Sequence, residues 1–424
     1  MSSEKPTVVI VGAGFGGLNA ARELRASPVN VILIDKNNYH LFQPLLYQVA
    51  TAGLSPTDIA YPVRAIFRKQ KNFTFRLAEV TGIDFERRVV STAYESLPYD
   101  YLILATGGET NYFGLESVRQ NGYEMKSLQD AIAIRNHVLS MFELAAEIVD
   151  EEECQALRTF VVVGGGPTGV ECAGALSELI RLVLRKDFPE LDISKAQVLL
   201  LEALDRVLAG FPEELSRAAV RTLEDKRVEV RFGASVESYD GRQILLKGGE
   251  SIQAATLIWA AGVRAAEMLG WTGLPQGRGG RVLVEPGLQT PGHPEVFIIG
   301  DAAYMEADGQ PLPMVAPVAI QQGKTAARNI RRIIAGEEPL PFQYKDPGSL
   351  ATIGRNAAVA RVGRFKFSGF IAWVVWLVVH LFWLVGFRNR LLVMINWAWD
   401  YFFFDRGVRL ITRRILPQRE KVAQ

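Results

Sequence analysis

Two short apolar runs along this chain lead directly into glycine-rich turns. The first run, Thr7–Val11, is β-branched at every position, which is typical of a buried strand in a parallel sheet. Gly12-Ala13-Gly14-Phe15-Gly16-Gly17 follows it with the spacing G-x-G-x-x-G. The residues from Leu18 to Leu24 are then predicted to form a helix, and Val29–Ile34 a second buried strand. The pattern therefore predicts a β–α–β unit.

Each glycine of the first turn has a physical reason to be there. Gly12 permits the tight turn, Gly14 lets a pyrophosphate approach the backbone, and Gly17 lets the helix pack closely on the strand. Asp35 ends the second strand, 23 residues after Gly12, where a carboxylate accepts hydrogen bonds from a ribose diol. The unit therefore predicts a Rossmann-type dinucleotide site. A glycine-rich turn in some other α/β protein is the weaker interpretation, because strand, glycines, helix and acid all agree.

The arrangement recurs after residue 158. Strand Thr159–Val163 leads into Gly164-Gly165-Gly166-Pro167-Thr168-Gly169, and Pro167 suits the first turn of a helix. The next strand, Gln197–Leu201, ends at an acid 38 residues after the first glycine. The extra length falls in the charged stretch Arg181–Lys195, which we expect to be a helix extension and a loop.

Glu202 is the acid at that strand end. A carboxylate bonds a free 2′-hydroxyl and repels a 2′-phosphate, so Glu202 favours NADH over NADPH. Arg206 follows closely and argues slightly in the other direction.

Three more predicted strands end in turns of small residues. Tyr101–Gly107 and Leu257–Gly262 have matching form, and each follows its own glycine-rich unit at a similar distance. Phe297–Ala303 is the third, and its Asp301 is placed to bond a ribityl hydroxyl, although an ordinary turn before a helix would look similar. Together these motifs resemble the two-dinucleotide-binding-domain flavoprotein fold over about residues 6 to 335. That resemblance implies an α/β fold of glutathione-reductase type, in which an NAD domain is inserted into an FAD domain.

Composition removes other classes of partner and chemistry. The chain has 424 residues, 49% of them hydrophobic and 22% charged, which predicts two or three globular domains. A net charge of +1 gives no positive field for nucleic acid. Cys154 and Cys172 form no C-x-x-C pair, so neither a disulfide framework nor a dithiol redox centre is expected. No cluster of metal ligands is visible. The residues before Pro6 lack the pattern of a signal peptide, so we expect a cytosolic N-terminus.

Three stretches resemble the type II NADH dehydrogenases, which are single-subunit NADH:quinone oxidoreductases. The first, Asp35–Ala50, runs beside the flavin in that family. The second, Ala316–Gly323, resembles the family's A-Q-x-A-x-Q quinone motif, with Pro317 in place of the first glutamine and Gln321 at the second. The third is the aromatic C-terminal tail. Because proline has no side-chain amide, the quinone contact that the family's first glutamine would make is not assigned here. Disulfide reductases and sulfide:quinone oxidoreductases need reactive cysteines that this chain does not have.

The resemblance implies non-covalently bound FAD, NADH as the electron donor, and a membrane quinone of the ubiquinone or menaquinone type as the acceptor. Hydride would pass to the flavin, which would reduce the quinone to quinol without pumping protons. Two alternatives stay open: a related reductase with a soluble protein acceptor, and a flavin-bound redox sensor with low turnover. A homodimer is a further expectation.

The site residues implied by these motifs fall into three groups. The FAD group comprises Gly12, Ala13, Gly14, Phe15, Gly16, Gly17, Asp35, Lys36, Gln43, Pro44, Val80, Ala105, Thr106, Gly107, Gly300, Asp301 and Ala316. The NADH group comprises Gly164, Gly166, Pro167, Thr168, Gly169, Glu202, Ala261 and Gly262. The quinone group comprises Ala316, Pro317, Ile320 and Gln321. A helix from Val318 to Arg328 would direct its positive end at the flavin pyrimidine ring.

Glu171 and Gln321 are the candidate catalytic residues, and each has an ordinary interpretation as well. Glu171 would either complement the helix dipole, worth ~0.3–1 kcal/mol, or position the cofactor and relay protons beside the two rings. The sequence leaves the choice for Glu171 open. Gln321 would otherwise be a solvated helix residue, and only the motif around it favours a site role.

The last quarter of the chain is unusually apolar and aromatic. Five of the seven tryptophans lie between Trp373 and Trp399, and Phe370–Phe387 is an 18-residue run interrupted only by His380 and Gly386. As a helix it would extend ~27 Å, marginal for the ~30 Å hydrocarbon core of a bilayer. On that helix Trp373, Trp376, His380, Trp383 and Phe387 would form one aromatic face.

A second, amphipathic helix is predicted from Leu391 to Phe404, after an interruption at Arg388-Asn389-Arg390. Its polar face would carry Asn396 and Asp400, and its apolar face would carry Leu392, Ile395, Trp399 and Phe402. The last 37 residues contain eight Lys or Arg against three Asp or Glu, which suits an anionic membrane surface.

The tail has three interpretations: a transmembrane span, a monotopic helical hairpin in one leaflet, or a soluble dimer interface. The resemblance favours the hairpin, which would hold the protein at the cytoplasmic face of the cell membrane. The expected domains are an FAD-binding domain in two parts (1–120 and 263–345, the second with the quinone motif), an NADH-binding domain (121–262) and C-terminal membrane-anchoring helices (346–424).

Overall fold

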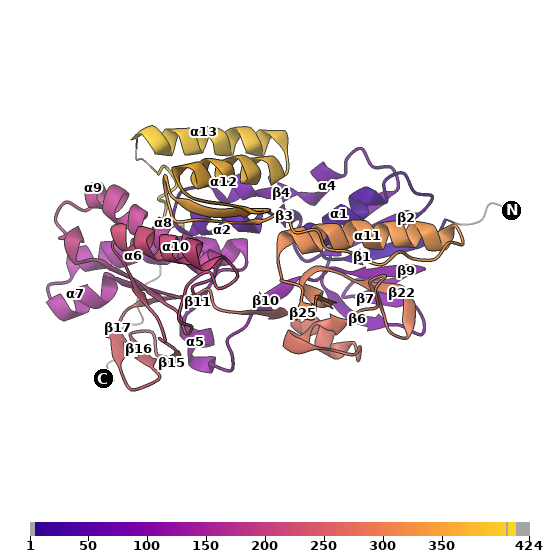
Figure 1. Cartoon of the computed structure of the whole chain (residues 1–424), viewed down its shortest axis with the longest axis horizontal. Helices are drawn as coiled ribbons and strands as arrows, with labels where there is room; N and C mark the ends of the chain where they lie inside the picture. Colours follow the sequence, from indigo (N-terminus) through magenta and orange to yellow (C-terminus); the bar gives the residue numbers. More distant parts are fainter. Residues whose placement is uncertain (1–4, 404–405, 413–424) are drawn as a thin grey trace. The chain divides into compact units, whose positions relative to one another are not determined.

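The structure, a computed structural model, describes residues 5–403 and 406–412. The chain forms two compact units, each assembled from three segments (Figure 1). Unit 1 comprises Met1–Leu41, Ala60–Asn111 and Val263–Pro347, and unit 2 comprises Phe42–Ile59, Tyr112–Gly262 and Gly348–Gln424.

Unit 1 is built on a six-stranded sheet with the order β21-β22-β9-β1-β2-β5. All neighbours pair in parallel except the short edge strand β21. The central strands are covered on both faces, and Val8, Val9 and Ile10 are fully buried, as their unbroken β-branched run predicts. The strands are β1 (Thr7–Val11), β2 (Asn30–Asp35), β5 (Phe73–Leu77), β9 (Tyr101–Leu104), β21 (Gln289–Thr290) and β22 (His293–Ile298).

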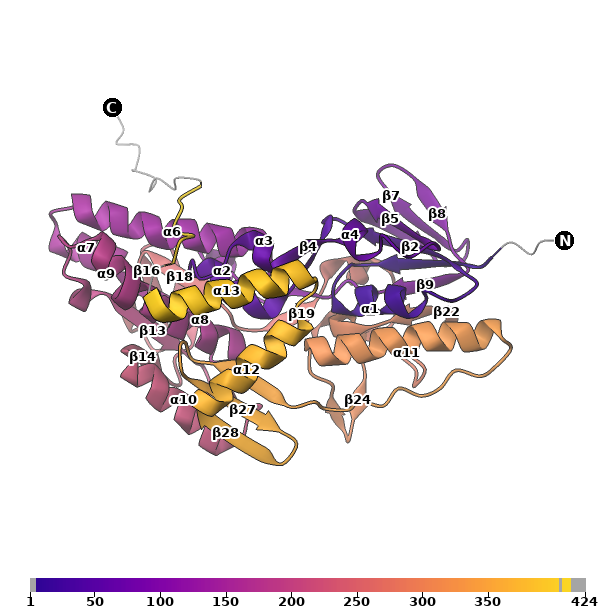
Figure 2. The ribbon, with the colours of Figure 1, turned by 90° about the horizontal axis from the view of Figure 1, so that it is seen from above.

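Two helices of unit 1 run alongside each other against this sheet, α1 (Phe15–Glu23) and α11 (Ala316–Ile334) (Figure 2). Glycines permit the close approach, because a Cβ on Gly323 would collide with the Gly16 carbonyl oxygen. The sequence predicted α11 only from Val318 to Arg328, and that length was wrong. Pro317 lies in the first turn, where no intrahelical N–H is required, and the amphipathic pattern continues to Ile334.

Smaller elements complete unit 1. The antiparallel pairs are β3 (Tyr39–Leu41) with β4 (Ala60–Pro62), β10 (Gly108–Thr110) with β19 (Val263–Ala265), and β24 (Glu306–Ala307) with β25 (Gln310–Pro311). A three-stranded antiparallel sheet contains β6 (Val80–Asp84), β7 (Val89–Thr92) and β8 (Ser96–Pro98). The remainder are α4 (Val63–Ile66), β20 (Val282–Leu283), β23 (Ala303–Tyr304) and the 3-10 turns η4 (Glu267–Trp271), η5 (Arg278–Gly280) and η6 (Gly300–Ala302).

Unit 2 contains the second Rossmann sheet, with the parallel order β11-β18-β12-β13-β14. The strands are β11 (Tyr123–Glu124), β12 (Thr159–Val163), β13 (Gln197–Leu201), β14 (Val228–Arg231) and β18 (Thr256–Trp259). Its longer helices are α6 (Leu128–Glu147), α8 (Pro167–Glu178) and α10 (Glu213–Asp225). The α/β class and the two parallel sheets expected from the sequence are therefore confirmed.

The long spacing before Glu202 is a helix extension and a loop, as predicted. Helix α8 continues through a π-helical turn, η2 (Leu179–Leu184), into α9 (Arg185–Asp187), and the chain then passes through η3 (Ile193–Lys195) to β13. The other elements of unit 2 before residue 348 are η1 (Gln43–Leu45), α2 (Leu46–Ala50), α3 (Pro56–Ile59), α5 (Glu116–Asn121), α7 (Glu151–Leu157), β15 (Val236–Tyr239), β16 (Gln243–Leu246) and β17 (Ser251–Gln253).

The C-terminal part of unit 2 is a three-stranded antiparallel sheet followed by two helices. The sheet contains β26 (Ser349–Thr352), β27 (Ala358–Val362) and β28 (Phe365–Gly369), and the adjacent helices are α12 (Phe370–Trp383) and α13 (Phe387–Phe403) (Figure 1). Among the described residues, no helix combines the length and the apolar character that crossing a membrane requires.

The break between these helices differs from the prediction. It falls at Leu384–Gly386, where Gly386 has a φ of 93°, a conformation that favours glycine. The residues Arg388-Asn389-Arg390 belong to the first turn of α13 and do not separate the two helices. The predicted start of the second helix was too late because the polar Asn389 was taken for a solvated linker residue. In the structure Asn389 is a buried residue of α13.

Candidate functional site

The first glycine-rich turn, in unit 1, is held by the strand on either side of it. Gly12 has a φ of 104°, and its N–H donates to the Ile34 carbonyl over 2.8 Å. The Asp35 carboxylate accepts hydrogen bonds from the N–H groups of Ala13 and Asn37, both at 2.6 Å. A Cβ on Gly14 would meet no atom within 4 Å, so the space in front of this residue is open. A ligand can therefore approach the backbone of the turn closely at Gly14.

Other predicted FAD residues of unit 1 lie at the same edge of the sheet. Ala105, Thr106 and Gly107 follow β9, which neighbours β1, and Gly300 and Asp301 follow β22, which neighbours β9. Both groups therefore stand at the carboxyl ends of parallel strands. The Thr106 hydroxyl oxygen is buried and has no hydrogen-bond partner among the described residues.

The remaining FAD candidates occupy varied places. Lys36 follows β2, Val80 begins β6 in the core of unit 1, and Ala316 begins α11. Gln43 and Pro44 belong to unit 2, where the Gln43 amide donates to the Lys126 carbonyl over 3.4 Å.

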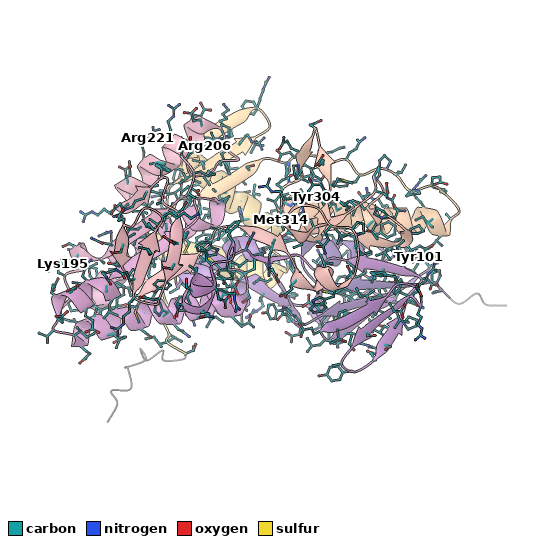
Figure 3. The ribbon with its side chains drawn as sticks, turned by 90° about the horizontal axis from the view of Figure 1, so that it is seen from below. Tyr101, Lys195, Arg206, Arg221, Tyr304 and Met314 are labelled. Atoms are coloured by element: carbon teal, nitrogen blue, oxygen red, sulfur yellow. The ribbon has the colours of Figure 1, made fainter. Side chains whose placement is uncertain are left out.

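Two side chains that support the Gly300–Asp301 turn were not predicted. Gln322 is fully buried in α11, and its amide oxygen accepts a hydrogen bond of 2.7 Å from the Gly300 N–H. The Arg281 guanidinium is also buried, donates to the Ala303 and Leu312 carbonyls at 2.9 Å, and lies over the ring of Tyr304, labelled in Figure 3. Gln322 lies one helical turn after the buried Val318, and this i+4 spacing was the available signal.

The second glycine-rich turn, in unit 2, repeats the construction of the first. The Gly164 N–H donates to the Leu201 carbonyl over 2.8 Å, and Gly164 has a φ of 108°. One Glu202 oxygen accepts from the Gly165 N–H at 2.6 Å, and the other accepts from the Leu204 N–H at 2.7 Å. A Cβ on Gly166 would meet nothing within 4 Å.

The other predicted residues of this second turn occupy matching places. Pro167, Thr168 and Gly169 form the start of α8, where Gly169 packs against the Gly164 carbonyl. Ala261 and Gly262 follow β18, the neighbouring strand of the sheet.

Glu171 is a buried carboxyl group. Its side chain lies in α8 with the residue 8% exposed, and burial raises its pKa to about 8. The Thr352 N–H donates to Oε1 over 3.3 Å, and this bond together with Trp376 acts in the opposite direction, lowering the pKa. Of the two interpretations offered by the sequence, a solvated Glu171 that only complements the helix dipole does not match this buried environment. At neutral pH, Glu171 holds a proton.

An aromatic and amide cluster lies near Glu171 in unit 2. The Gln48 amide donates to the Tyr47 phenol oxygen and accepts from the Trp397 indole N–H, both at 2.8 Å. Burial and the charge of Glu171 raise the pKa of Tyr47 well above its usual value. Tyr47 also contacts Trp376 edge-on, with the ring centroids 6.5 Å apart. Tyr47 and Gln48 fall within the Asp35–Ala50 stretch that the sequence singled out, but their connection to Trp397 had no sequence signal.

His380 belongs to the same aromatic cluster. Its ring stacks on Trp376 with the centroids 4.1 Å apart, and its Nδ1 lies 2.8 Å from the Trp376 carbonyl oxygen. Burial lowers the pKa of His380 to about 4, so the imidazole is neutral at physiological pH. The stacking on Trp376 places His380 among aromatic side chains, as expected of a residue on the aromatic face.

Gln321, in unit 1, is bound at both ends of its amide to the backbone of Lys345. Its Nε2 donates to the Lys345 carbonyl over 2.8 Å, and its Oε1 accepts from the Lys345 N–H at 3.0 Å. Ala316, Pro317 and Ile320 precede it in the first two turns of α11. The geometry thus gives Gln321 a structural contact as well as its place in the motif.

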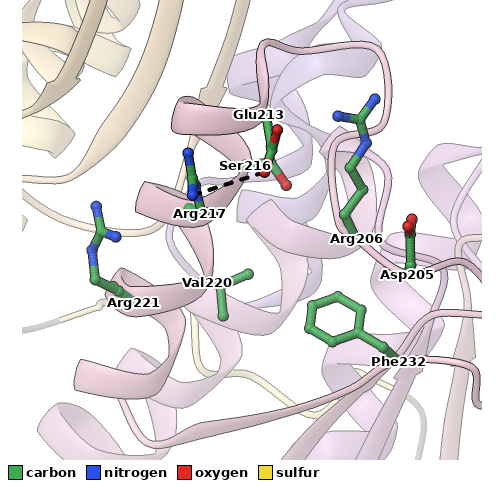
Figure 4. Close-up of a pocket in the computed structure, with 8 residues that line it drawn as sticks. All are labelled: Asp205, Arg206, Glu213, Ser216, Arg217, Val220, Arg221 and Phe232. Carbon is green, nitrogen blue, oxygen red and sulfur yellow. Dashed lines mark ion pairs between the residues drawn. The ribbon is translucent and has the colours of Figure 1, made fainter.

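A cavity of about 720 Å³ lies in unit 2 near the carboxyl ends of β13 and β14. Figure 4 shows α10 side chains along one side of it and Asp205, Arg206 and Phe232 along the other. Three arginines and two acids give it a mixed charge, and Glu213 pairs with Arg217 at 3.8 Å. Its lining residues are Asp205, Arg206, Glu213, Ser216, Arg217, Val220, Arg221 and Phe232.

Comparison with known proteins places the chain in a family. The family model for pyridine nucleotide-disulphide oxidoreductases matches residues 6–323, and the model for the NDH2 C-terminal domain matches residues 347–406. The type II NADH:quinone oxidoreductase Ndh of Mycobacterium tuberculosis is 41% identical over 98% of this chain and 92% of its own length. This chain belongs to the type II NADH:quinone oxidoreductases. The family resemblance inferred from the sequence is therefore confirmed.

More distant members of the type II family are also similar. The type II NADH:quinone oxidoreductase of Staphylococcus haemolyticus is 30% identical, covering 85% of this chain and 91% of its own length. The solved structure of NDH2 from Plasmodium falciparum shares the fold with a TM-score of 0.88, at 20% identity, over 97% of this chain and all of that one. Members of the pyridine nucleotide-disulphide oxidoreductase family are flavoproteins that bind FAD and NAD(P)H, which agrees with two dinucleotide turns of like construction.

Proposed function

We propose that this chain oxidises NADH and reduces a membrane quinone to quinol through non-covalently bound FAD. The observation that carries the proposal is the pair of dinucleotide turns, each anchored to a carboxylate at the end of its second strand. The similarity to type II enzymes over nearly the whole chain supports the same activity. The related reductase with a soluble acceptor and the redox sensor have no specific observation in their favour.

The residues of unit 1 fit an FAD molecule. Gly14 opens onto space that a Cβ would fill, and α1 begins without a side-chain cap, which leaves N–H groups for a pyrophosphate. The Thr106 hydroxyl is a buried group in need of a hydrogen-bond partner. The FAD residues named from the sequence would hold the cofactor, and bound FAD would accept a hydride and pass on two electrons.

The residues of unit 2 fit NADH in the same way. Gly166 is open, and α8 also begins without a side-chain cap. Glu202, held in place by the Gly165 and Leu204 N–H groups, retains lone pairs for a ribose 2′-hydroxyl and repels a 2′-phosphate. The cavity beside Asp205 and Arg206 offers space for the adenosine end of the dinucleotide.

Glu171 is our candidate for the proton donor. Reduction of a quinone to quinol takes two electrons and two protons, and NADH supplies these as one hydride, so one more proton must be provided. With its pKa raised to about 8, Glu171 carries that proton at neutral pH and can return to this state after each turnover. The Thr352 N–H and Trp376 would stabilise the carboxylate once the proton has left. Ala316, Pro317, Ile320 and Gln321 remain the candidates for quinone contact.

The exposed face of α12 and α13 supports attachment to a lipid surface. Large apolar side chains are open to solvent there, including Phe382 at 71%, Phe387 at 80% and Phe402 at 72%. Several large apolar side chains exposed on two adjacent helices are typical of an interaction site. We propose that this face lies in one leaflet at the cytoplasmic side of the membrane, as the family resemblance implies. The two parts of the FAD domain, the NADH domain and the C-terminal anchor expected from the sequence are retained in the proposal.

Acceptor specificity tests this function. Purified holoenzyme is given NADH and either a short-chain quinone or a soluble electron-transfer protein, and NADH oxidation is followed by absorbance. We expect rapid oxidation with the quinone and little with the protein. Oxidation only with the protein acceptor would select the alternative reductase, and no oxidation with either acceptor would favour the sensor.

A further inference from the structure

The sequence assigned no role to His40, which lies beside the first glycine-rich turn. His40 stands in β3 of unit 1, and it is 1% exposed. Its Nδ1 lies 2.9 Å from the carbonyl oxygen of Ala13, the residue between Gly12 and Gly14. The imidazole ring also contacts Phe15 edge-on, with the ring centroids 5.1 Å apart. A buried polar side chain thus contacts the centre of the turn.

The chemistry of the contact identifies the tautomer of His40. A carbonyl oxygen can only accept, so Nδ1 must carry the hydrogen and donate it. Burial lowers the pKa of His40 to about 4, so the ring is neutral and Nε2 has a lone pair. That nitrogen is buried and has no partner among the described residues. The one hydrogen bond that His40 donates therefore goes to Ala13.

Ala13 is consequently held from both sides. Its N–H donates to the Asp35 carboxylate, and its carbonyl accepts from His40. With these two bonds the peptide groups before and after Ala13 have little freedom to rotate. The direction of the following N–H groups, at the start of α1, depends on that orientation.

The second dinucleotide turn provides an internal comparison. The matching residue there is Gly165, whose N–H donates to Glu202 just as the Ala13 N–H donates to Asp35. The Gly165 carbonyl is also held, but by the backbone N–H of Leu208 at 2.7 Å. Both turns thus hold this carbonyl with an N–H donor, and only the first turn depends on a side chain for it.

We propose that His40 is a positioning residue of the FAD site. By donating its Nδ1–H to the Ala13 carbonyl, it sets the backbone of the turn so that the N–H groups at the start of α1 face the FAD pyrophosphate. This role rests on the proposed function in one respect, that FAD occupies the first turn. His40 acts through the backbone and takes no part in hydride or proton transfer.

Two amide substitutions separate this bond from general packing. An Asn side chain places its N–H near the position of Nδ1, and a Gln side chain places it near Nε2. We therefore expect His40→Asn to retain the bond to Ala13, and His40→Gln and His40→Phe to lose it. FAD retention is measured on full-length purified holoenzyme, as the rise in flavin fluorescence when the enzyme is diluted.

His40→Gln and His40→Phe are expected to release FAD at about tenfold lower dilution than the wild type, the usual effect of one buried hydrogen bond, while His40→Asn stays within about twofold. His137→Phe is the control, because His137 is another buried histidine whose pKa burial lowers to about 4, but it lies in unit 2. It should retain FAD normally. Wild-type retention in His40→Phe, or equal losses in His40→Asn and His40→Phe, would overturn the role of His40. Purified wild-type protein that contains no FAD and does not bind added FAD would instead overturn the proposed function.

Discussion

Some residues of the candidate site were predictable from the sequence, and others were not. The glycines and strand-end acids of both turns were predictable, because local backbone geometry dictates those residue types at that spacing. The burial of Glu171 was not, since its surroundings come from Thr352 and Trp376, far along the chain. The role of Gln322 was not predicted for the same reason. Gln322 lies in α11, and its partner Gly300 follows β22, 22 residues earlier in the chain.

The pH dependence of turnover tests Glu171. A proton donor must be protonated, so activity should be high below its pKa of about 8 and fall as the pH rises through that value. Glu171→Gln should lower kcat with quinone about 100-fold, the usual contribution of general acid catalysis, and should flatten this pH profile.

NADH bleaching of the flavin serves as the control for that variant, since it needs no proton from Glu171 and should be preserved. If the activity of Glu171→Gln with quinone still fell at alkaline pH as the wild-type activity does, another group would supply the proton.

Nucleotide selectivity tests Glu202. Replacing it with Ala removes the charge that disfavours a 2′-phosphate and frees the Gly165 and Leu204 N–H groups. We expect the ratio of kcat/KM for NADH to that for NADPH to fall about tenfold, the value of one charged hydrogen bond. Glu237→Ala, which removes an exposed acid of β15 that does not line the cavity, should leave the ratio unaltered. An unchanged ratio in Glu202→Ala would remove the ribose contact from the account.

Among the elements, strands were predicted better than helix ends. Thr159–Val163 and Gln197–Leu201 match their predicted bounds because buried parallel strands have continuous apolar sequences. The ends of α12 and α13 depend on tertiary contacts that no periodicity reveals. Asn389 donates to the Thr57 and Asp58 carbonyls, and Asn396 donates to the Asp58 carboxylate, so the polar side of α13 faces the protein and not water.

This packing suggests how to test the apolar face of the two helices. Deleting them would also remove Trp376, which is buried near Tyr47. Replacing exposed Phe382, Phe387 and Phe402 by Ser should instead reduce binding to phospholipid vesicles more than tenfold, because each loses burial worth ~1.5–3 kcal/mol, and should preserve NADH bleaching of the flavin.

Sedimentation with vesicles measures the loss. Tyr94→Ser is the matched control, because Tyr94 is 85% exposed in unit 1 and its loss should leave vesicle binding intact. Full vesicle binding by the triple variant would mean that this face is not the lipid contact.

At the scale of the whole molecule, the motifs predicted two Rossmann units, and their resemblance to the two-dinucleotide-binding-domain flavoproteins implied that one unit is inserted into the other. What it did not reveal is how the remaining segments join them. The structure clusters Phe42–Ile59 and the C-terminal part from Gly348 with the second glycine-rich unit. Tyr47, Glu171 and Trp376 therefore share one compact unit, although they come from three distant parts of the chain.

Sequential-mixing stopped-flow absorbance of the flavin tests the central claim most directly. Under anaerobic conditions the purified holoenzyme is mixed first with NADH and then with a short-chain quinone. The account predicts that NADH alone bleaches the flavin band and that quinone alone restores it, at rates no slower than steady-state turnover. A flavin band that NADH bleaches but no quinone restores would contradict it.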